Sequence, residues 1–207
     1  MDATDWDHRY STNHDPRGNT PSTTIRSRLA AAKPGQAVDI ACGDGRHAHW
    51  LAHHGWHVTG VDFSHVALSH ARHLDIQQRI DWVHADATTW NPDNPVDLVL
   101  ITYLHLPVDD LVKLIHRATS WLNPHGRLLY LGNAHDNHTR GVGGPRDPGV
   151  LPDITTLAHA ATGTFVHELR HQLRPTNQGN AIDILLDLTP WAAPTQLATS
   201  QHPDLPP

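Results

Sequence analysis

The chain has 207 residues, a formal net charge of −6 and 38% hydrophobic residues, which suits one domain with a sizeable buried core. The single Cys42 excludes an internal disulfide, the 15 basic residues form no run suited to a nucleic-acid backbone, and no apolar run approaches the roughly 20 residues of a membrane span. With a polar N-terminus that lacks a signal-peptide core, these features predict a cytoplasmic monomer or homodimer with no membrane or nucleic-acid partner.

The predicted elements alternate between helices and strands along most of the chain. Pro16, Gly18 and Pro21 predict an irregular lead over residues 1–24. After it we expect, in chain order, a helix over 25–32, a strand over 37–42, a helix over 46–54, a strand over 56–63, a helix over 65–74, strands over 80–87 and 96–103, a helix over 109–122, a strand over 127–132, a helix over 153–161 and strands over 164–174 and 180–188.

This order predicts the fold class. The strand over 96–103 is apolar on both faces, which is typical of a parallel strand covered by helices on both sides. The last two strands follow each other directly and predict an antiparallel pair. We therefore expect an α/β fold with a Rossmann-like doubly wound sheet, mostly parallel, that ends in an antiparallel C-terminal strand pair.

The expected domain organisation has three parts. Residues 1–24 form a lead over the ligand site, residues 25–189 form the domain, and the Pro-rich residues 190–207 form a disordered tail. Within the domain, residues 133–152 predict a long loop dense in glycine and proline. A loop of this length is usually functional or disordered.

The strongest motif is the run Val-Asp-Ile-Ala-Cys-Gly-Asp-Gly over residues 38–45, where a strand enters a tight turn before a helix. Glycines let the backbone approach a ligand closely, and the helix start adds free N–H groups. A dinucleotide fingerprint would need glycine at 41, 43 and 46, but the chain has Ala41 and Arg46. No Gly-Lys-Ser/Thr follows, so a P-loop is also excluded.

Two acids follow the next two strands. Asp62 ends the second strand, where Rossmann-like sheets point an acid at ribose hydroxyls, and Asp86 ends the third strand. With Asp39 in the first strand, three acids then lie along the sheet edge at which such folds bind ligands. Three carboxylates with no nearby lysine favour a cationic ligand.

These motifs resemble those of the class I S-adenosylmethionine-dependent methyltransferases over about residues 35–135. The likeness rests on D-I-A-C-G-D-G, V-D-F-S and H-A-D-A, and one departure is Ala41, where the family often has glycine. The resemblance implies S-adenosylmethionine as cofactor, with the methionine part at the glycine turn, the ribose at Asp62 and the adenine at Asp86. The cofactor-binding residues expected from it are Asp39, Ala41, Cys42, Gly43, Gly45, Asp62, Phe63, Asp86, Ala87 and Tyr103.

A narrower likeness concerns two further motifs. W-x-x-R-Y over residues 6–10 and G-G-P-x-D-P over residues 143–148 are similar to a small bacterial subgroup near the tellurite-resistance and thiopurine-type methyltransferases. We expect the lead and the long loop to contribute acceptor-binding residues: Arg9, Tyr10, Arg140 and Arg146. The two loop arginines suit an anionic acceptor.

The expected reaction is in-line displacement of a methyl group onto a small-molecule acceptor. A thiol or a chalcogen oxyanion needs little help from a base, and positioning then supplies much of the rate. The Asn/Asp-Pro-Pro-Tyr/Phe motif of enzymes that act on planar amino groups is absent after the fourth strand. For acceptors that need deprotonation, His105 and His135 are the candidate bases.

Two other functions stay open at this point. One is a nicotinamide-dependent oxidoreductase on a similar fold, which the missing third glycine disfavours. The other is a non-enzymatic metal-binding protein that uses the 20 histidines. Pairs such as His49 and His53 recur, but no H-E-x-x-H or C-x-x-C is present, so we expect no native metal site.

Overall fold

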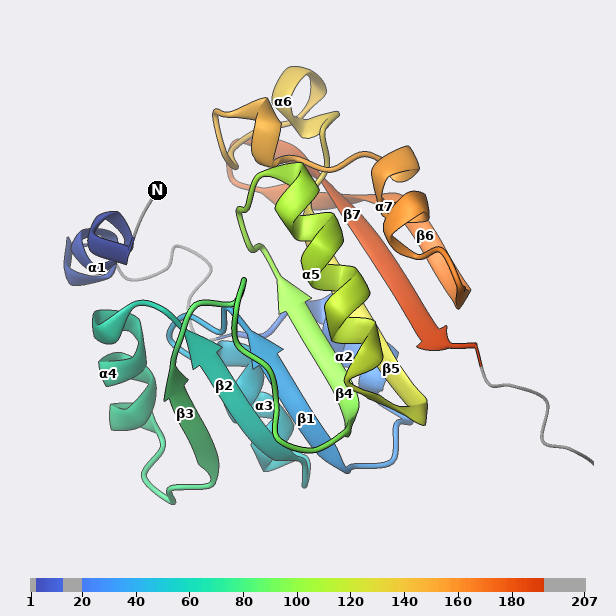
Figure 1. The fold of residues 1–207 in the computed structure, drawn as a ribbon. Coiled ribbons are helices and arrows are strands. Elements are labelled where there is room, and N and C mark those ends of the chain that lie inside the picture. The colour runs from blue at the N-terminus through green and yellow to red at the C-terminus, as the bar shows by residue number, and fades with distance from the viewer. Residues whose placement is uncertain (1–2, 13–19, 192–207) are drawn as a thin grey trace, which may run out of the picture.

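The computed structural model describes residues 3–12 and 20–191, which form a seven-stranded sheet with helices on both faces (Figure 1). The strand order is β3-β2-β1-β4-β5-β7-β6. The strands are β1 (Gln36–Ile40), β2 (His57–Asp62), β3 (Ile80–His84), β4 (Val96–Thr102), β5 (Leu122–Asn133), β6 (Thr164–Thr176) and β7 (Gly179–Pro190). The helices are α1 (Ala3–Thr12), α2 (Thr23–Leu29), α3 (Arg46–His53), α4 (His65–Leu74), α5 (Val108–Ser120), α6 (Asn137–Arg140) and α7 (Ile154–Ala160), with a 3-10 turn over Pro148–Val150.

The sheet is parallel from β3 to β5 and antiparallel over β5, β7 and β6. This confirms the predicted fold class. Because β1, β2, β3 and β4 are parallel, their carboxyl ends meet at one edge of the sheet. The strand order runs outward from β1 to β3 on one side and from β4 to β5 on the other. The first βα turn lies at the centre of that edge, which is the topological position of ligand sites in open α/β sheets.

The core lies on both faces of β4, as its sequence predicted. Leu98 and Leu100 pack with Leu51 of α3 and Ile25 of α2 on one face. On the other face, Val99 and Ile101 pack with apolar residues of α5: Leu111, Leu114, Ile115 and Ala118. In Figure 1, α5 lies in front of the sheet while α2 and α3 lie behind it.

The start of β5 differs from the prediction. The run Asn-Pro-His-Gly was expected to end a helix before a strand at residue 127, but β5 already pairs with β4 at Leu122. Val96 pairs with Leu122 and Leu98 with Arg127, so this run forms an irregularity within the strand. Gly126 permits it, because a Cβ there would lie 2.9 Å from the Val96 carbonyl oxygen.

The irregular lead predicted for residues 1–24 is wrong for Ala3–Thr12, which forms α1. The breakers Pro16 and Gly18 follow this segment and do not interrupt it, and tertiary contacts with α4 hold the helix. The long loop over 133–152 contains the short helix α6 and the 3-10 turn. The tail was predicted to be disordered from residue 190, but Pro190 is the last residue of β7, and the rest of the prediction, residues 192–207, lies outside the described residues.

Candidate active site

In the turn between β1 and α3, every second residue has a backbone conformation in the left-handed region. Ala41 has φ 55°, Gly43 φ 59° and Gly45 φ 81°. A non-glycine residue is uncommon in this region and marks a strained backbone. The glycine that the family often has at position 41 would relieve that strain. The conformation leaves the N–H groups of the turn and of the α3 start at the sheet edge.

Asp62 joins this turn to the end of β2. Its Oδ2 accepts a hydrogen bond from the Gly43 backbone N–H at 2.9 Å, and its Oδ1 accepts one from the Ser64 N–H, also at 2.9 Å. The residue is only 6% exposed. Burial raises the pKa of Asp62, and the hydrogen bonds from Ser64 and Gly43 oppose that rise. Because each carboxylate oxygen can accept a further bond, Asp62 still has acceptor capacity for a ligand hydroxyl.

Asp39 lies in β1 directly below the turn and is fully buried. Neither of its carboxylate oxygens has a hydrogen-bond partner among the described residues. Burial raises the pKa of Asp39 to about 7, although the nearby charge of Arg46 opposes this. An orphaned buried carboxylate is costly unless a donor or a cation reaches it, so the turn suits a ligand that brings positive charge.

Asp86 follows β3 and is exposed at the same edge. Its Oδ1 accepts hydrogen bonds from the backbone N–H and the hydroxyl of Thr88, both at 2.7 Å. Arg117 of α5 donates to the carbonyl oxygens of Ala87 and Thr88 at 2.5 and 2.6 Å. These bonds fix the loop after β3, so Asp86 and Ala87 keep a defined position beside the glycine turn.

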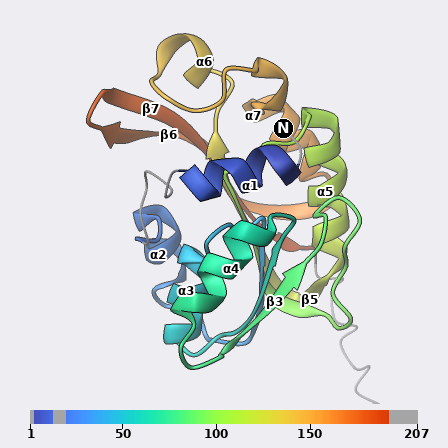
Figure 2. The same ribbon diagram turned by 90° about the vertical axis from the view of Figure 1, so that its left-hand side faces the viewer.

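Helix α1 lies across this edge beside α4 (Figure 2). Asp7 anchors it, because its Oδ1 accepts hydrogen bonds from the Ser64 hydroxyl at 2.5 Å and the Val66 N–H at 3.2 Å. Trp6 then lies 5.9 Å from Tyr10 and 6.1 Å from His105 between ring centroids. The Tyr10 hydroxyl lies so close to Gly43 that a side chain at Gly43 would overlap it.

These elements enclose a first cavity of about 100 Å³ at the glycine turn. The predicted site residues that line it are Tyr10, Ala41, Cys42, Gly43, Asp62, Phe63, Asp86, Ala87, Tyr103 and His105. Asp39 and Gly45 are not among the residues that line it. Trp6, the first residue of the W-x-x-R-Y motif, also lines it. Sequence reasoning missed several further lining residues, namely Asp44, Arg46, Thr102, Leu104 and Leu106.

Cys42 is part of this wall and is buried. Burial, then the nearby charges of Asp39 and Asp62, raise the pKa of its thiol well above the usual value. The thiolate is the reactive form of cysteine, so this environment makes Cys42 inert. Its small side chain packs against Gly60 of β2, as expected of a packing residue.

A second and larger cleft of about 1590 Å³ adjoins the first cavity. It is bounded by the end of α1, the segment before α2, the start of α3, the loop over 142–150 and the β6–β7 hairpin. Arg46, Tyr103 and His105 line both spaces, so the two adjoin at these residues, and we call this junction the passage. We call this second space the arginine cleft, after its five lining arginines: Arg9, Arg46, Arg146, Arg170 and Arg174.

The structure brings two of the four predicted acceptor-binding residues, Arg9 and Arg146, to the arginine cleft, and places Tyr10 in the first cavity. Arg140 is exposed and pairs with Asp136 on α6, outside both spaces. His135 is also exposed and lies outside both. Sequence signals could have found Arg46, which directly follows the glycine turn. Arg174 carries no such signal, because only the fold of the β6–β7 hairpin brings it there.

Metal binding and membrane crossing are the remaining points. Within residues 3–12 and 20–191, no three His, Cys, Asp or Glu side chains gather closely enough to hold a metal ion. No helix in the same part of the chain is both long and apolar enough to cross a membrane.

Residues 37–126 match the family described as "Methyltransferase domain". The strand order and the site above agree with this match, so residues 37–126 carry a methyltransferase domain of the class I, S-adenosylmethionine-dependent type. The class predicted from the sequence, and its cofactor, are therefore confirmed. The buried Asp39 and the free acceptor capacity of Asp62 fit a cofactor that carries a sulfonium charge and ribose hydroxyls.

Two relatives are similar in sequence over part of the chain. The ribosomal RNA small subunit methyltransferase C of Alcanivorax borkumensis is 30% identical over 107 residues, which cover 49% of this chain and 33% of that protein. The trans-aconitate 2-methyltransferase of Methylobacterium radiotolerans is 28% identical over 126 residues, which cover 60% of this chain and 48% of that protein. The chain thus spans half or less of the length of these relatives.

Solved structures share the fold at lower identity. The N-methyltransferase NodS from Bradyrhizobium japonicum, solved with S-adenosylhomocysteine, has a TM-score of 0.73 at 18% identity, over 90% of this chain and 96% of that one. TehB from Haemophilus influenzae has a TM-score of 0.71 at 15% identity, over 89% of this chain and 66% of that one. Both are similar in architecture over most of the described residues.

Proposed function

We propose that this protein transfers a methyl group from S-adenosylmethionine to a small-molecule acceptor. The observation that carries the proposal is that a cavity lined by acids suited to the cofactor adjoins a separate cleft for a second molecule at Arg46, Tyr103 and His105. A methyl transferase needs two such adjoining sites, because acceptor, methyl group and sulfur must lie in line.

The proposed cofactor contacts follow from the geometry. Asp62 accepts from the ribose hydroxyls while it holds Gly43 and Ser64. Asp86 accepts from the adenine amino group, and the loop fixed by Arg117 keeps it in place. The methionine part lies at the turn beside Gly43, near the buried Asp39. When bound, the cofactor supplies a methyl group on a positively charged sulfur, and these carboxylates favour that charge.

The chain's own residues contribute position and exclusion of water. Trp6 and Tyr10 of α1 cover the turn, and Tyr103 separates the two spaces. Thiols and chalcogen oxyanions are the acceptors that we propose to test first, since soft nucleophiles need no base. For an acceptor that must lose a proton, His105 is the candidate base, because it lines both spaces and His135 lines neither.

Binding of S-adenosylhomocysteine tests the site. Calorimetry is expected to show micromolar affinity for the wild type and at least about tenfold weaker affinity for Asp62→Asn and Asp86→Asn, since each loses a charged acceptor. The control is Asp81→Asn, an exposed acid on β3 away from the cavity. Thermal unfolding of each variant shows that it is folded. Unchanged affinity in Asp62→Asn would refute the proposed site.

The acceptor is then found by a screen with S-adenosylhomocysteine release as the readout. The panel contains thiols, selenite and tellurite, small carboxylic acids and amines. Turnover with one class and not with the others identifies the acceptor. A protein that binds S-adenosylhomocysteine, but forms none from S-adenosylmethionine with any class of acceptor, would contradict the proposed transfer.

A further inference from the structure

The arginine cleft concentrates positive charge in a chain whose formal net charge is −6. Five of the 15 basic residues line it, and Asp147 is the one carboxylate among its described lining residues. The five come from α1, the start of α3, the loop over 142–150 and β6, which are distant in sequence. Such convergence of guanidinium groups in a concave space favours an anionic ligand.

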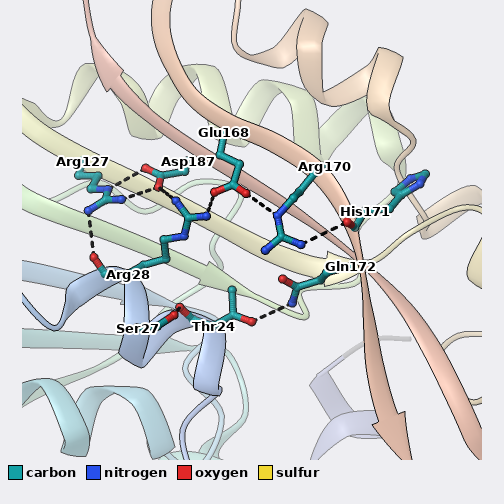
Figure 3. Close-up of polar contacts among 9 residues, drawn as sticks. All are labelled: Thr24, Ser27, Arg28, Arg127, Glu168, Arg170, His171, Gln172 and Asp187. Atoms are coloured by element: carbon teal, nitrogen blue, oxygen red, sulfur yellow. Dashed lines mark hydrogen bonds and ion pairs between the residues drawn. The ribbon is translucent and has the colours of Figure 1, made fainter.

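Two of these arginines already have carboxylate partners, which must be discounted. Arg170 pairs with Glu168, and Glu168 also pairs with Arg28 of α2 (Figure 3). Arg174 binds the buried Asp183 through Nε at 2.7 Å and through a second nitrogen at 3.3 Å. Arg46 acts on the buried Asp39 and is set aside as well. The two exposed arginines Arg9 and Arg146 still outnumber Asp147, whose Oδ1 accepts from the Gly149 N–H. The cleft therefore stays positive.

Polar contacts tie together the wall of the cleft beside α2. Arg28 and Arg127 both bind Asp187, which is fully buried in β7, and Gln172 of β6 donates to the Thr24 hydroxyl at 2.9 Å. Figure 3 shows these contacts tying α2 across to β6 and β7. A fixed array of donors can recognise a ligand with several anionic groups at lower entropic cost than mobile side chains can.

The positive charge reaches the passage itself. The guanidinium carbons of Arg46 and Arg174 each lie 5.5 Å from the centroid of the Tyr103 ring. The Tyr103 hydroxyl donates to Asp183 at 2.8 Å, so the ring is held between the two spaces. Tyr103 also has φ 53°, a strained conformation of the kind that is found at functional sites. An anionic group at the passage therefore lies within reach of two guanidinium groups.

We infer that the arginine cleft binds an acceptor with two or more carboxylates, and that one of these carboxylates receives the methyl group; this rests on the proposed function. A single small oxyanion would meet few of the arginines in a space of about 1590 Å³, whereas a polycarboxylate can meet several. A carboxylate oxygen forms the new C–O bond as the C–S bond breaks. The products are a neutral methyl ester and a neutral thioether, and no proton has to be removed.

This chemistry matches the charges of the site. The acceptor loses one negative charge on methylation, so the product binds the arginines more weakly than the acceptor and can leave. A carboxylate acceptor loses no proton, so the transfer needs no base at the passage. The polar lining, which includes Asn133 and Ser22, suits the remaining carboxylates.

The first test is binding without the cofactor, with propane-1,2,3-tricarboxylate as the probe in calorimetry. We expect binding that weakens with added salt, and affinity for acetate at least about tenfold lower. Arg146→Gln is expected to weaken tricarboxylate binding about three- to tenfold, because an exposed charged donor is lost. Arg26→Gln, an exposed arginine of α2 outside the cleft, is the matched control and is expected to bind like the wild type.

Arg174→Gln should have a larger effect, but it removes the charged partner of the buried Asp183 and endangers folding, so Arg146 is the primary variant. All variants are also titrated with S-adenosylhomocysteine, which Arg146→Gln should bind normally. With labelled S-adenosylmethionine, the expected product is a base-labile methyl ester. Normal S-adenosylhomocysteine binding with no tricarboxylate binding would overturn this inference alone, whereas loss of both would also refute the proposed function.

Three further arms distinguish other ligands. A sugar phosphate that binds more tightly than the tricarboxylate and is methylated in its place would overturn the carboxylate assignment. So would a thiol or tellurite that is methylated equally well by the wild type and Arg146→Gln. Binding of a ribosomal RNA fragment that is lost in Arg146→Gln would assign the cleft to nucleic acid and overturn the inference.

Discussion

Asp39 combines complete burial with the absence of a hydrogen-bond partner among the described residues. Such a group weakens the fold when it is ionised, yet it lies where a cationic ligand would bind. We interpret Asp39 as a residue that lowers the stability of the free protein and raises its affinity for the cationic ligand. The strained Ala41 and Tyr103 on either side of the cavity have the same character.

This interpretation predicts how Asp39→Asn changes stability with pH in the absence of cofactor. The pKa of Asp39 is about 7 in the folded protein and near 3.8 when unfolded. Between these values only the unfolded state loses the proton, so the free energy of unfolding of the wild type falls as pH rises. Asp39→Asn lacks this loss and should be more stable than the wild type at pH 8, by at most about 4 kcal/mol.

Urea unfolding at pH 4, 6 and 8 measures the effect. The difference between variant and wild type should grow with pH and level off above pH 7. The same comparison with the exposed Asp81→Asn controls for net charge. A difference that is constant across the three pH values would show that Asp39 is not protonated in the folded state.

Helix α1 is attached to the rest of the protein through Asp7. None of its residues is buried, so packing alone does not hold it. Asp7 attaches it to the start of α4, where Ser64 also caps that helix by accepting from the Ala67 N–H at 3.1 Å. The Ser64 hydroxyl, and then the Val66 N–H, lower the pKa of Asp7 against the opposing effect of burial. The anchor therefore consists of an ionised carboxylate.

We predict that Asp7→Ala releases α1 and weakens S-adenosylhomocysteine binding about three- to tenfold, because Trp6 and Tyr10 no longer cover the turn. Asp7→Asn keeps one oxygen acceptor and should fall between this variant and the wild type. His8→Ala, an exposed position on the same helix, is the control. Calorimetry gives the affinities, and unchanged binding in Asp7→Ala would show that α1 does not contribute to the site.

Surface histidine sets the electrostatics of the whole molecule. The formal charge is −6 with neutral histidines, and protonation of all 20 would change it to −6 + 20 = +14. Since histidine has a reference pKa of about 6.5, the net charge passes through zero in mildly acidic solution. Repulsion between molecules is weakest there.

We therefore predict a solubility minimum between about pH 5.5 and 6.5, from the reference pKa of histidine. Turbidity of a concentrated sample across pH 4 to 9 measures it, and salt should reduce the minimum's depth by screening. A minimum near pH 4.5, where carboxyl groups titrate, would show that histidine does not control the surface charge.

The sequence by itself determined the sheet and the cofactor side of the site. Strands and helices could be predicted because their apolar periodicity is local, and the glycine turn, Asp62 and Asp86 follow three successive strands, so parallel pairing alone brings them to one edge. The start of β5 could not be predicted in this way, because its pairing with β4 depends on a close backbone approach at Gly126.

Only the tertiary structure decided the acceptor side. Arg46 and Arg174 meet at Tyr103 because the fold brings β6 and the start of α3 to the same cleft, and no local pattern encodes that meeting. For the same reason the sequence could not separate Arg146, in the cleft, from Arg140, which pairs with Asp136 outside it. Likewise α1 is ordered by Asp7, a long-range contact. Periodicity reports which face of an element is buried, whereas convergence of side chains from distant segments depends on how the elements pack.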